Sequence, residues 1–214
     1  MSSKIEDRIL GSSGRLWTPA DLSGAPSTKS HLLSCLTARG ELQRIRKGLY
    51  WRGRMTPLGM APPPPELITR ALLPKVKGIG PAGLSAANRL RLSTQVPRRA
   101  HIAVPHRAPT STQAVRYLSR AARHERGRQA LSETEVALLE VLEAWNDVIE
   151  VSEAQAWALL GQLVRSSSVR PDRLAAAAKT EPAAVRSRLA RLLRETDQQA
   201  AAAKIPAVDR RVSV

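Results

Sequence analysis

Four consecutive prolines, Pro62–Pro65, constrain this chain of 214 residues more than any other feature of its sequence. Proline lacks the backbone donor that a helix or a central strand needs, and it forces the residue before it out of helical geometry. The run therefore predicts an extended connector. We place a linker at residues 61–66, between an N-terminal domain over 1–60 and a second domain over 67–200, followed by a tail at 201–214.

Three short helices are predicted in the first domain from N-capping residues, a proline at a helix start and apolar spacings of three and four. They cover Lys4–Leu10, then Pro19 to about Gly24 with Thr18 as N-cap, then residues 28–39 with Ser27 as N-cap. In the third helix, Leu32, Leu33 and Leu36 repeat at the spacing of one buried face. That spacing leaves short hydrogen-bonding side chains on the opposite face.

A hairpin is predicted over residues 41–51. Leu42 and Ile45 lie among basic residues, and a turn is expected at Lys47-Gly48. Three short helices followed by a hairpin are typical of a winged helix-turn-helix, whose third helix fits the major groove of DNA. The residues predicted to contact DNA are Thr28, Lys29, Ser30, His31, Ser34, Arg39, Arg44, Arg46 and Lys47.

The charge balance favours a polyanionic partner. The chain carries 34 Lys and Arg against 18 Asp and Glu, a formal net charge of +16. Six cations between Arg39 and Arg54 are opposed only by Glu41, which would make the hairpin an electrostatic clamp. The alternative is that these arginines form an ordinary solvated surface. Aromatic content of 3% argues against stacking on single-stranded RNA and favours duplex DNA.

The second domain is predicted to be mostly helical with a short strand pair, so the fold class is mainly α with small β. Helices are expected over Glu66–Leu73 and Pro81–Leu90, a strand over His101–Val104, amphipathic helices after the capping pairs Ser132/Glu135 and Ser152/Gln155, and further helices from Pro171 and Pro182. The arginine-rich helix 182–195 is either a packed helical end or part of a second helix-turn-helix. Its apolar stripe favours the packed end.

At this point the chain resembles a known family, the AbiEi-type antitoxins of bacterial type IV toxin–antitoxin operons. The resemblance rests on Trp17–Leu22, Leu32–Leu36 and above all Gly40–Tyr50, and it continues through Gly80–Asn88 and Leu92–Pro97. It implies a C-terminal antitoxin region and a nucleotidyltransferase-like toxin encoded next door. Helices of this family usually carry an apolar residue where Lys29 stands, so Lys29 either extends toward DNA or shifts the helix register.

Several other signals are weaker. Gly78–Gly83 fits the pattern G-x-G-x-x-G, but Pro74 interrupts the strand that a dinucleotide site needs, so we expect a turn and no cofactor. The four histidines lack ligand spacing, and Cys35 is a single cysteine read as a small buried hydrophobe, so no metal is expected. We find no nucleophile motif and expect no enzyme. We also find no signal-peptide core and no long apolar run, and we expect a cytoplasmic protein without a membrane partner.

These features together predict a transcriptional autorepressor and antitoxin that binds double-stranded operator DNA through its winged helix. The operon and the toxin come from the family resemblance, and the antitoxin role is assigned to the second domain without named residues. The alternative is a basic adaptor that neutralises an acidic protein partner by direct contact, through a surface within residues 70–128.

Overall fold

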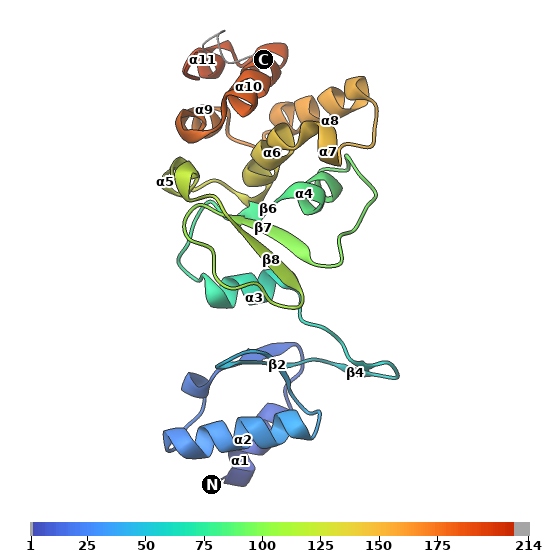
Figure 1. Ribbon diagram of the computed structural model, residues 1–214, viewed down its shortest axis with the longest axis vertical. Coiled ribbons are helices and arrows are strands. Elements are labelled where there is room, and N and C mark those ends of the chain that lie inside the picture. The colour runs from blue at the N-terminus through green and yellow to red at the C-terminus, as the bar shows by residue number, and fades with distance from the viewer. Residues whose placement is uncertain (1, 208–214) are drawn as a thin grey trace. The chain divides into compact units, whose positions relative to one another are not determined.

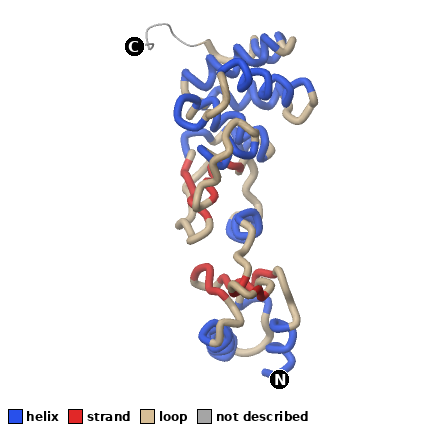
Figure 2. Tube along the Cα trace, turned by 90° about the vertical axis from the view of Figure 1, so that its right-hand side faces the viewer, coloured by secondary structure: helices blue, strands red, loops and turns tan. Residues whose placement is uncertain are grey.

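The computed structural model describes residues 2–207, which form two compact units (Figure 1). The first unit runs to Pro74 and includes Thr112–Val115, and the second contains the remaining residues. Helices predominate and the sheets are small (Figure 2), so the predicted fold class is confirmed. Of the tail expected at 201–214, residues 208–214 lie outside the described residues, and residues 201 and 202 belong to a helix.

The first unit has the element order of a winged helix, with a 3₁₀ turn in place of the second helix. In chain order its elements are α1 (Ser2–Leu10), β1 (Arg15–Trp17), the 3₁₀ turn η1 (Pro19–Asp21), α2 (Pro26–Ala38), β2 (Gln43–Arg46), β3 (Leu49–Arg52), β4 (Met55–Thr56), β5 (Gly59–Met60) and α3 (Pro65–Leu72). Strands β1, β3 and β2 form an antiparallel sheet in that order. The hairpin turn falls at Lys47-Gly48 as predicted, and Gly48 adopts a φ of 78° that favours glycine.

The predicted second helix is wrong in length. It is a single 3₁₀ turn, because Leu22 already returns to extended backbone. Its predicted start is correct, since the Asp21 carboxylate accepts hydrogen bonds from the backbone and the hydroxyl of Thr18. The third helix, α2, begins at Pro26 with Ala25 as its N-cap, so the assignment of Ser27 as N-cap is also wrong. Proline suits the first helical turn, where its missing donor has no partner to lose.

A small apolar core fixes the orientation of α2 in this unit. Leu33 and Leu36 are fully buried together with Ile9 and Trp17, while Leu32 is only partly buried. The same unit extends past the prolines. Ile68 of α3 is fully buried, and α3 packs on β1. The division between the units therefore follows Pro74, later in the chain than the linker that the sequence predicts.

After Pro74 the chain forms a small sheet and then a cluster of helices. The elements are β6 (Gly80–Pro81), α4 (Gly83–Arg89), β7 (Ala100–Val104), β8 (Val115–Ser119), η2 (Ala121–Arg123), α5 (Glu125–Arg128), α6 (Glu133–Glu143), α7 (Trp145–Val148), α8 (Glu153–Arg165), α9 (Pro171–Ala177), η3 (Ala178–Thr180), α10 (Ala183–Glu195) and α11 (Gln199–Ala202). The sheet order is β6-β7-β8. Helix α6 is buried along most of its length and packs against α4, β6 and α10.

Most helix starts in this unit agree with the sequence. Ser132 and Glu135 form the predicted capping box at α6, and the Ser152 hydroxyl accepts from the Gln155 amide at α8. Helix α9 begins at Pro171, and Pro182 caps α10. Helix α4 begins later than the predicted Pro81, because that residue pairs with β7 in a short strand instead.

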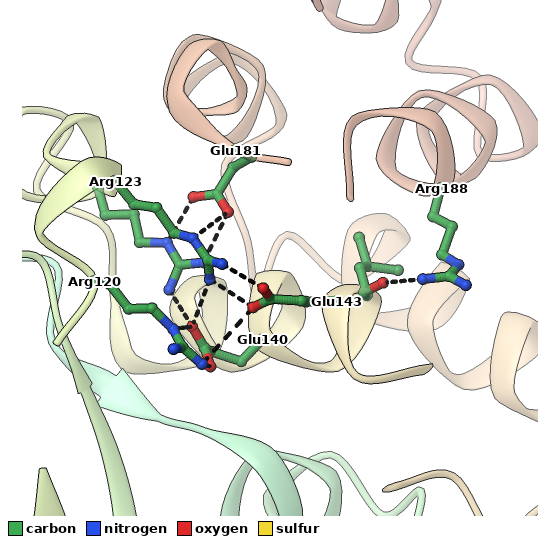
Figure 3. Close-up of polar contacts among 8 residues, drawn as sticks. Arg120, Arg123, Glu140, Glu143, Glu181 and Arg188 are labelled. Atoms are coloured by element: carbon green, nitrogen blue, oxygen red, sulfur yellow. Dashed lines mark hydrogen bonds and ion pairs between the residues drawn. The ribbon is translucent and has the colours of Figure 1, made fainter. Parts of the chain in front are cut away.

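Three arginines and three glutamates form an ion-pair network inside the second unit (Figure 3). Its members are Arg120, Arg123, Arg126, Glu140, Glu143 and Glu181. Arg126 is fully buried and donates two hydrogen bonds to Glu181, of 2.6 and 2.8 Å, and one of 2.6 Å to Glu140. Burial raises the pKa of the Glu140 carboxyl, but hydrogen bonds and charge from Arg120 and Arg126 outweigh it and hold that pKa below its ordinary value. The carboxylates and guanidinium groups therefore balance one another in the core.

Candidate nucleic-acid interface

Helix α2 presents a polar face that the other residues within 2–207 leave exposed. Thr28, Ser30, His31 and Ser34 are exposed; His31 lies opposite the buried Leu33 on the helix, and Ser30 lies at the edge of the exposed side, nearer to Leu33. Serine and threonine hydroxyls bond equally well to base edges and phosphates, so a face of this kind suits close approach to a DNA groove. Cys35 lies on the same outer side, half-buried, with its sulfur 3.4 Å from His31 Nε2. It does not join the core as a buried hydrophobe.

Lys29 is half-buried, whereas Thr28, Ser30, His31 and Ser34 are exposed. It precedes Leu33 by one helical turn and therefore shares its side of the helix. It lines an apolar groove with Ile5 and Leu22, and Thr28 lines the same groove. Because Leu33 and Leu36 keep the buried face, the register shift considered for this helix is absent.

Strand β2 and its turn carry the basic residues predicted for the wing. Arg44 and Arg46 are exposed and alternate with the half-buried Gln43 and Ile45, and Lys47 is exposed at the turn. Among residues 2–207, these three cations form no ion pair and no side-chain hydrogen bond. Cations without an internal partner can bind backbone phosphates and release the counterions held there.

Two other arginines of the predicted clamp have internal partners. Arg39 lies 2.7 Å from the Glu6 carboxylate, an ion pair between α2 and α1. Arg52 is largely buried, pairs with Glu41 at 3.1 Å and donates to backbone oxygens of Glu41 and Leu10. The clamp of six cations is therefore smaller than the sequence predicts. Arg54 remains exposed and without such a partner among the described residues.

The same part of the chain holds an element that the sequence analysis missed. Strands β4 and β5 form a second hairpin directly after β3, with Thr56 opposite Gly59. The signal was present in Thr56-Pro57-Leu58-Gly59, since proline and glycine occupy their preferred turn positions. Between Glu41 and Glu66 the sequence contains five basic residues and no acidic one. The first unit therefore contains both α2 and a segment, residues 42–65, whose charged side chains are all basic.

Comparisons with known proteins show a likeness of fold. No protein-family description matches the chain, and no curated protein matches it. Among solved structures, the crystal structure of the RV2827C protein from Mycobacterium tuberculosis is similar. The TM-score is 0.58 and the identity 19%, and the match covers 97% of this chain and 82% of that one.

The glycines of the Gly78–Gly83 motif have a packing role in the second unit. A Cβ at Gly80 would lie 2.7 Å from the Val136 Cβ atom, and one at Gly78 would lie 2.4 Å from the carbonyl of Arg126. Gly78 also has a φ of 72°. Gly78 and Gly80 require glycine because the chain passes close to α5 and α6 there.

Two of the four arginines of α10, Arg188 and Arg191, make contacts within the second unit. Arg188 donates a hydrogen bond of 2.6 Å to the Leu142 carbonyl, as Figure 3 shows, and Arg191 lies over the Trp157 ring and pairs with Glu195. The stripe of Val185, Leu189, Leu192 and Leu193 is buried. These contacts favour the packed helical end over a second DNA-reading helix. No helix within residues 2–207 is long and apolar enough to span a membrane.

Proposed function

We propose that this chain is a transcriptional repressor that binds double-stranded DNA through its first unit. The outward face of α2 would enter the major groove, with Thr28, Ser30, His31 and Ser34 at base edges or phosphates. Arg44, Arg46 and Lys47 would neutralise phosphates beside the groove. The observation that carries the proposal is that an uncovered polar helix face and an unpaired basic hairpin belong to one compact winged-helix unit.

Repression of its own operon is the regulatory role we propose. In this reading the protein is an autorepressor and the antitoxin of a type IV toxin–antitoxin pair, it works in the cytoplasm, and it acts by binding instead of catalysis. This part rests on the resemblance to the AbiEi-type antitoxins in Gly40–Tyr50. The second unit would supply the antitoxin role against a nucleotidyltransferase-like toxin.

A gel-shift titration on the DNA upstream of the protein's own gene tests the DNA-binding role. Arg44→Ala and Arg46→Ala should each weaken binding. Arg128→Ala is a control in the second unit, because it removes the same charge from a side chain that is 70% exposed, although that side chain, unlike Arg44 and Arg46, pairs with Glu125. Equal affinity of the three variants and the wild type, or equal binding to unrelated DNA, would count against a specific wing contact.

Co-expression with the neighbouring gene tests the antitoxin role separately. We expect the wild type and the Arg44→Ala, Arg46→Ala double variant both to relieve growth arrest, because the variant changes only the first unit. Repression of a reporter should be lost in the variant. An adjacent gene that is harmless on its own would remove the antitoxin part and leave the repressor part standing.

The second candidate function is an adaptor that binds an acidic protein. It is favoured by a group of exposed cations in the second unit that form no ion pair among the described residues. They are Arg91, Arg98, Arg99, Arg107 and Arg116. A pull-down at moderate salt with an Arg98→Glu, Arg99→Glu variant separates the two functions, since this change should abolish capture of an acidic partner while leaving the salt dependence of the wing in place.

A further inference from the structure

The β4–β5 hairpin ends in an apolar tip that no part of the described chain covers. Leu58 is 99% exposed at the two-residue turn Pro57-Leu58, and Met55 on the adjoining strand is 54% exposed. Single exposed leucines are common on protein surfaces. Leu58 stands at the end of a hairpin, and that position suits a contact made by insertion.

The hairpin is held firmly at its base. The indole of Trp51 donates a hydrogen bond of 2.7 Å to the Ala61 carbonyl, and the Ala61 amide donates one of 2.9 Å to the Arg54 carbonyl. Gly53 is buried beside this contact, where a Cβ would lie only 2.3 Å from the Ala61 oxygen. The two ends of the hairpin are therefore fixed to β3.

The tip itself is braced by a side chain. The Thr56 hydroxyl donates to the Gly59 carbonyl at 2.7 Å and accepts from the Leu58 amide at 3.2 Å. Gly59 has a φ of 102°, which an L side chain rarely adopts. The turn is thus pre-organised, so little conformational freedom is lost when its tip enters a binding site.

We propose that the β4–β5 hairpin is a second DNA contact that inserts Leu58 into the minor groove and bends the duplex. The inference rests on the proposed DNA-binding function and extends it. An exposed apolar tip could also contact a protein or a lipid, but the charge around it favours DNA. Arg54 is exposed at the base of the hairpin, and residues 42–65 contain no acidic side chain that would repel phosphates. Leucine and proline are among the side chains that minor-groove proteins use as wedges between base steps.

The dimensions of a hairpin agree with this role. Paired strands lie about 4.8 Å apart, and three residues of strand reach roughly 10 Å. The minor groove of B-DNA is about 6 Å wide and 7.5 Å deep. The tip is therefore long enough to reach the floor of the groove. The two backbone strands alone nearly fill its width, so the groove must widen to admit the Leu58 side chain. Flexible pyrimidine–purine steps widen and kink most readily, which would give sequence preference without base hydrogen bonds.

A bending assay on circularly permuted operator fragments tests the proposal. We expect the wild type to bend the DNA and Leu58→Ser to bind about 10- to 100-fold more weakly with little bending, since an exposed polar tip gains nothing from insertion. Val96→Ser is the matched control, because Val96 is 79% exposed in the second unit and its loss should change neither property. Thermal melts should agree among all three proteins.

The outcomes separate this inference from the proposed function. Absence of wild-type DNA binding would remove both. Equal binding and bending by the wild type and Leu58→Ser would overturn the insertion while the repressor proposal stands. Sedimentation without DNA supplies a third arm. Self-association of the wild type that is lost in Leu58→Ser, with DNA bending unchanged, would show that the tip docks on a second copy of the chain and would also overturn the proposal.

Discussion

Replacing Glu181 by glutamine should destabilise the second unit more than any other single charge change that we consider. Glu181 is buried and takes two hydrogen bonds from the fully buried Arg126. The network contains three guanidinium groups and three carboxylates, so Glu181→Gln leaves a net positive charge in the network, and Arg126 keeps only Glu140 as a carboxylate partner. Breaking a buried ion pair in this way costs about 3–5 kcal/mol. For a unit of this size the melting midpoint should fall by roughly 10–20 °C.

Differential scanning calorimetry and urea unfolding measure this effect, and the network supplies its own controls. Glu143→Gln changes a carboxylate whose side chain is 30% exposed, and it should cost at most about 1 kcal/mol. The double variant Arg126→Met, Glu181→Leu removes one charge of each sign and should recover much of the lost stability. The reasoning is refuted if Glu181→Gln melts within a degree or two of Glu143→Gln.

Three further predictions concern the second unit. Gly80→Ala should cost about 1–3 kcal/mol in urea unfolding, because its Cβ would meet Val136 at 2.7 Å, and an unchanged midpoint would refute the packing role of this glycine. Ser132→Ala removes the N-cap of α6 and should cost about 0.5–2 kcal/mol by the same assay, whereas no loss would show that the capping box is dispensable. Stability should also fall with acid: hydrogen bonds from Thr94 and Gln95 lower the pKa of Glu150 to about 2, so its contribution is complete above pH 4.5 and is lost as the pH falls toward 2. In Glu150→Gln the urea midpoint should therefore depend less on pH between 4.5 and 2 than in the wild type. The same pH dependence in both proteins would contradict this.

Local signals predicted the parts of the fold that depend on neighbouring residues. Pro19, Pro171 and Pro182 marked helix starts, and Gly48 marked the hairpin turn. Ser132 with Glu135 located the start of α6. Each of these features depends on residues no more than about four positions apart, where helix capping and backbone preferences act.

Features that depend on distant partners were missed. Strand β1 has only three residues and exists because it pairs with β3, far along the chain. Strand β8 carried only a weak signal: Val115 and Tyr117 flank the exposed Arg116, but the half-buried Leu118 then breaks the alternation. Arg126 and Arg128 look alike in the sequence of α5, yet one is fully buried and the other has a side chain 70% exposed.

The candidate site shows the same division. The exposed face of α2 and the alternation of Arg44 and Arg46 with half-buried residues follow from helix and strand periods, which a sequence displays. The partners of Arg39 and Arg52 depend on tertiary packing against Glu6 and Glu41, so the sequence overstates the number of available cations.

The dependence of operator affinity on salt is the most direct test of the wing. The proposal predicts a straight line of log affinity against log salt for the wild type, with a slope that becomes shallower by about 0.9 for each phosphate contact removed in Arg44→Ala and Arg46→Ala. Arg128→Ala should keep the wild-type slope. Slopes that are the same in all four proteins would contradict a phosphate-binding role for strand β2.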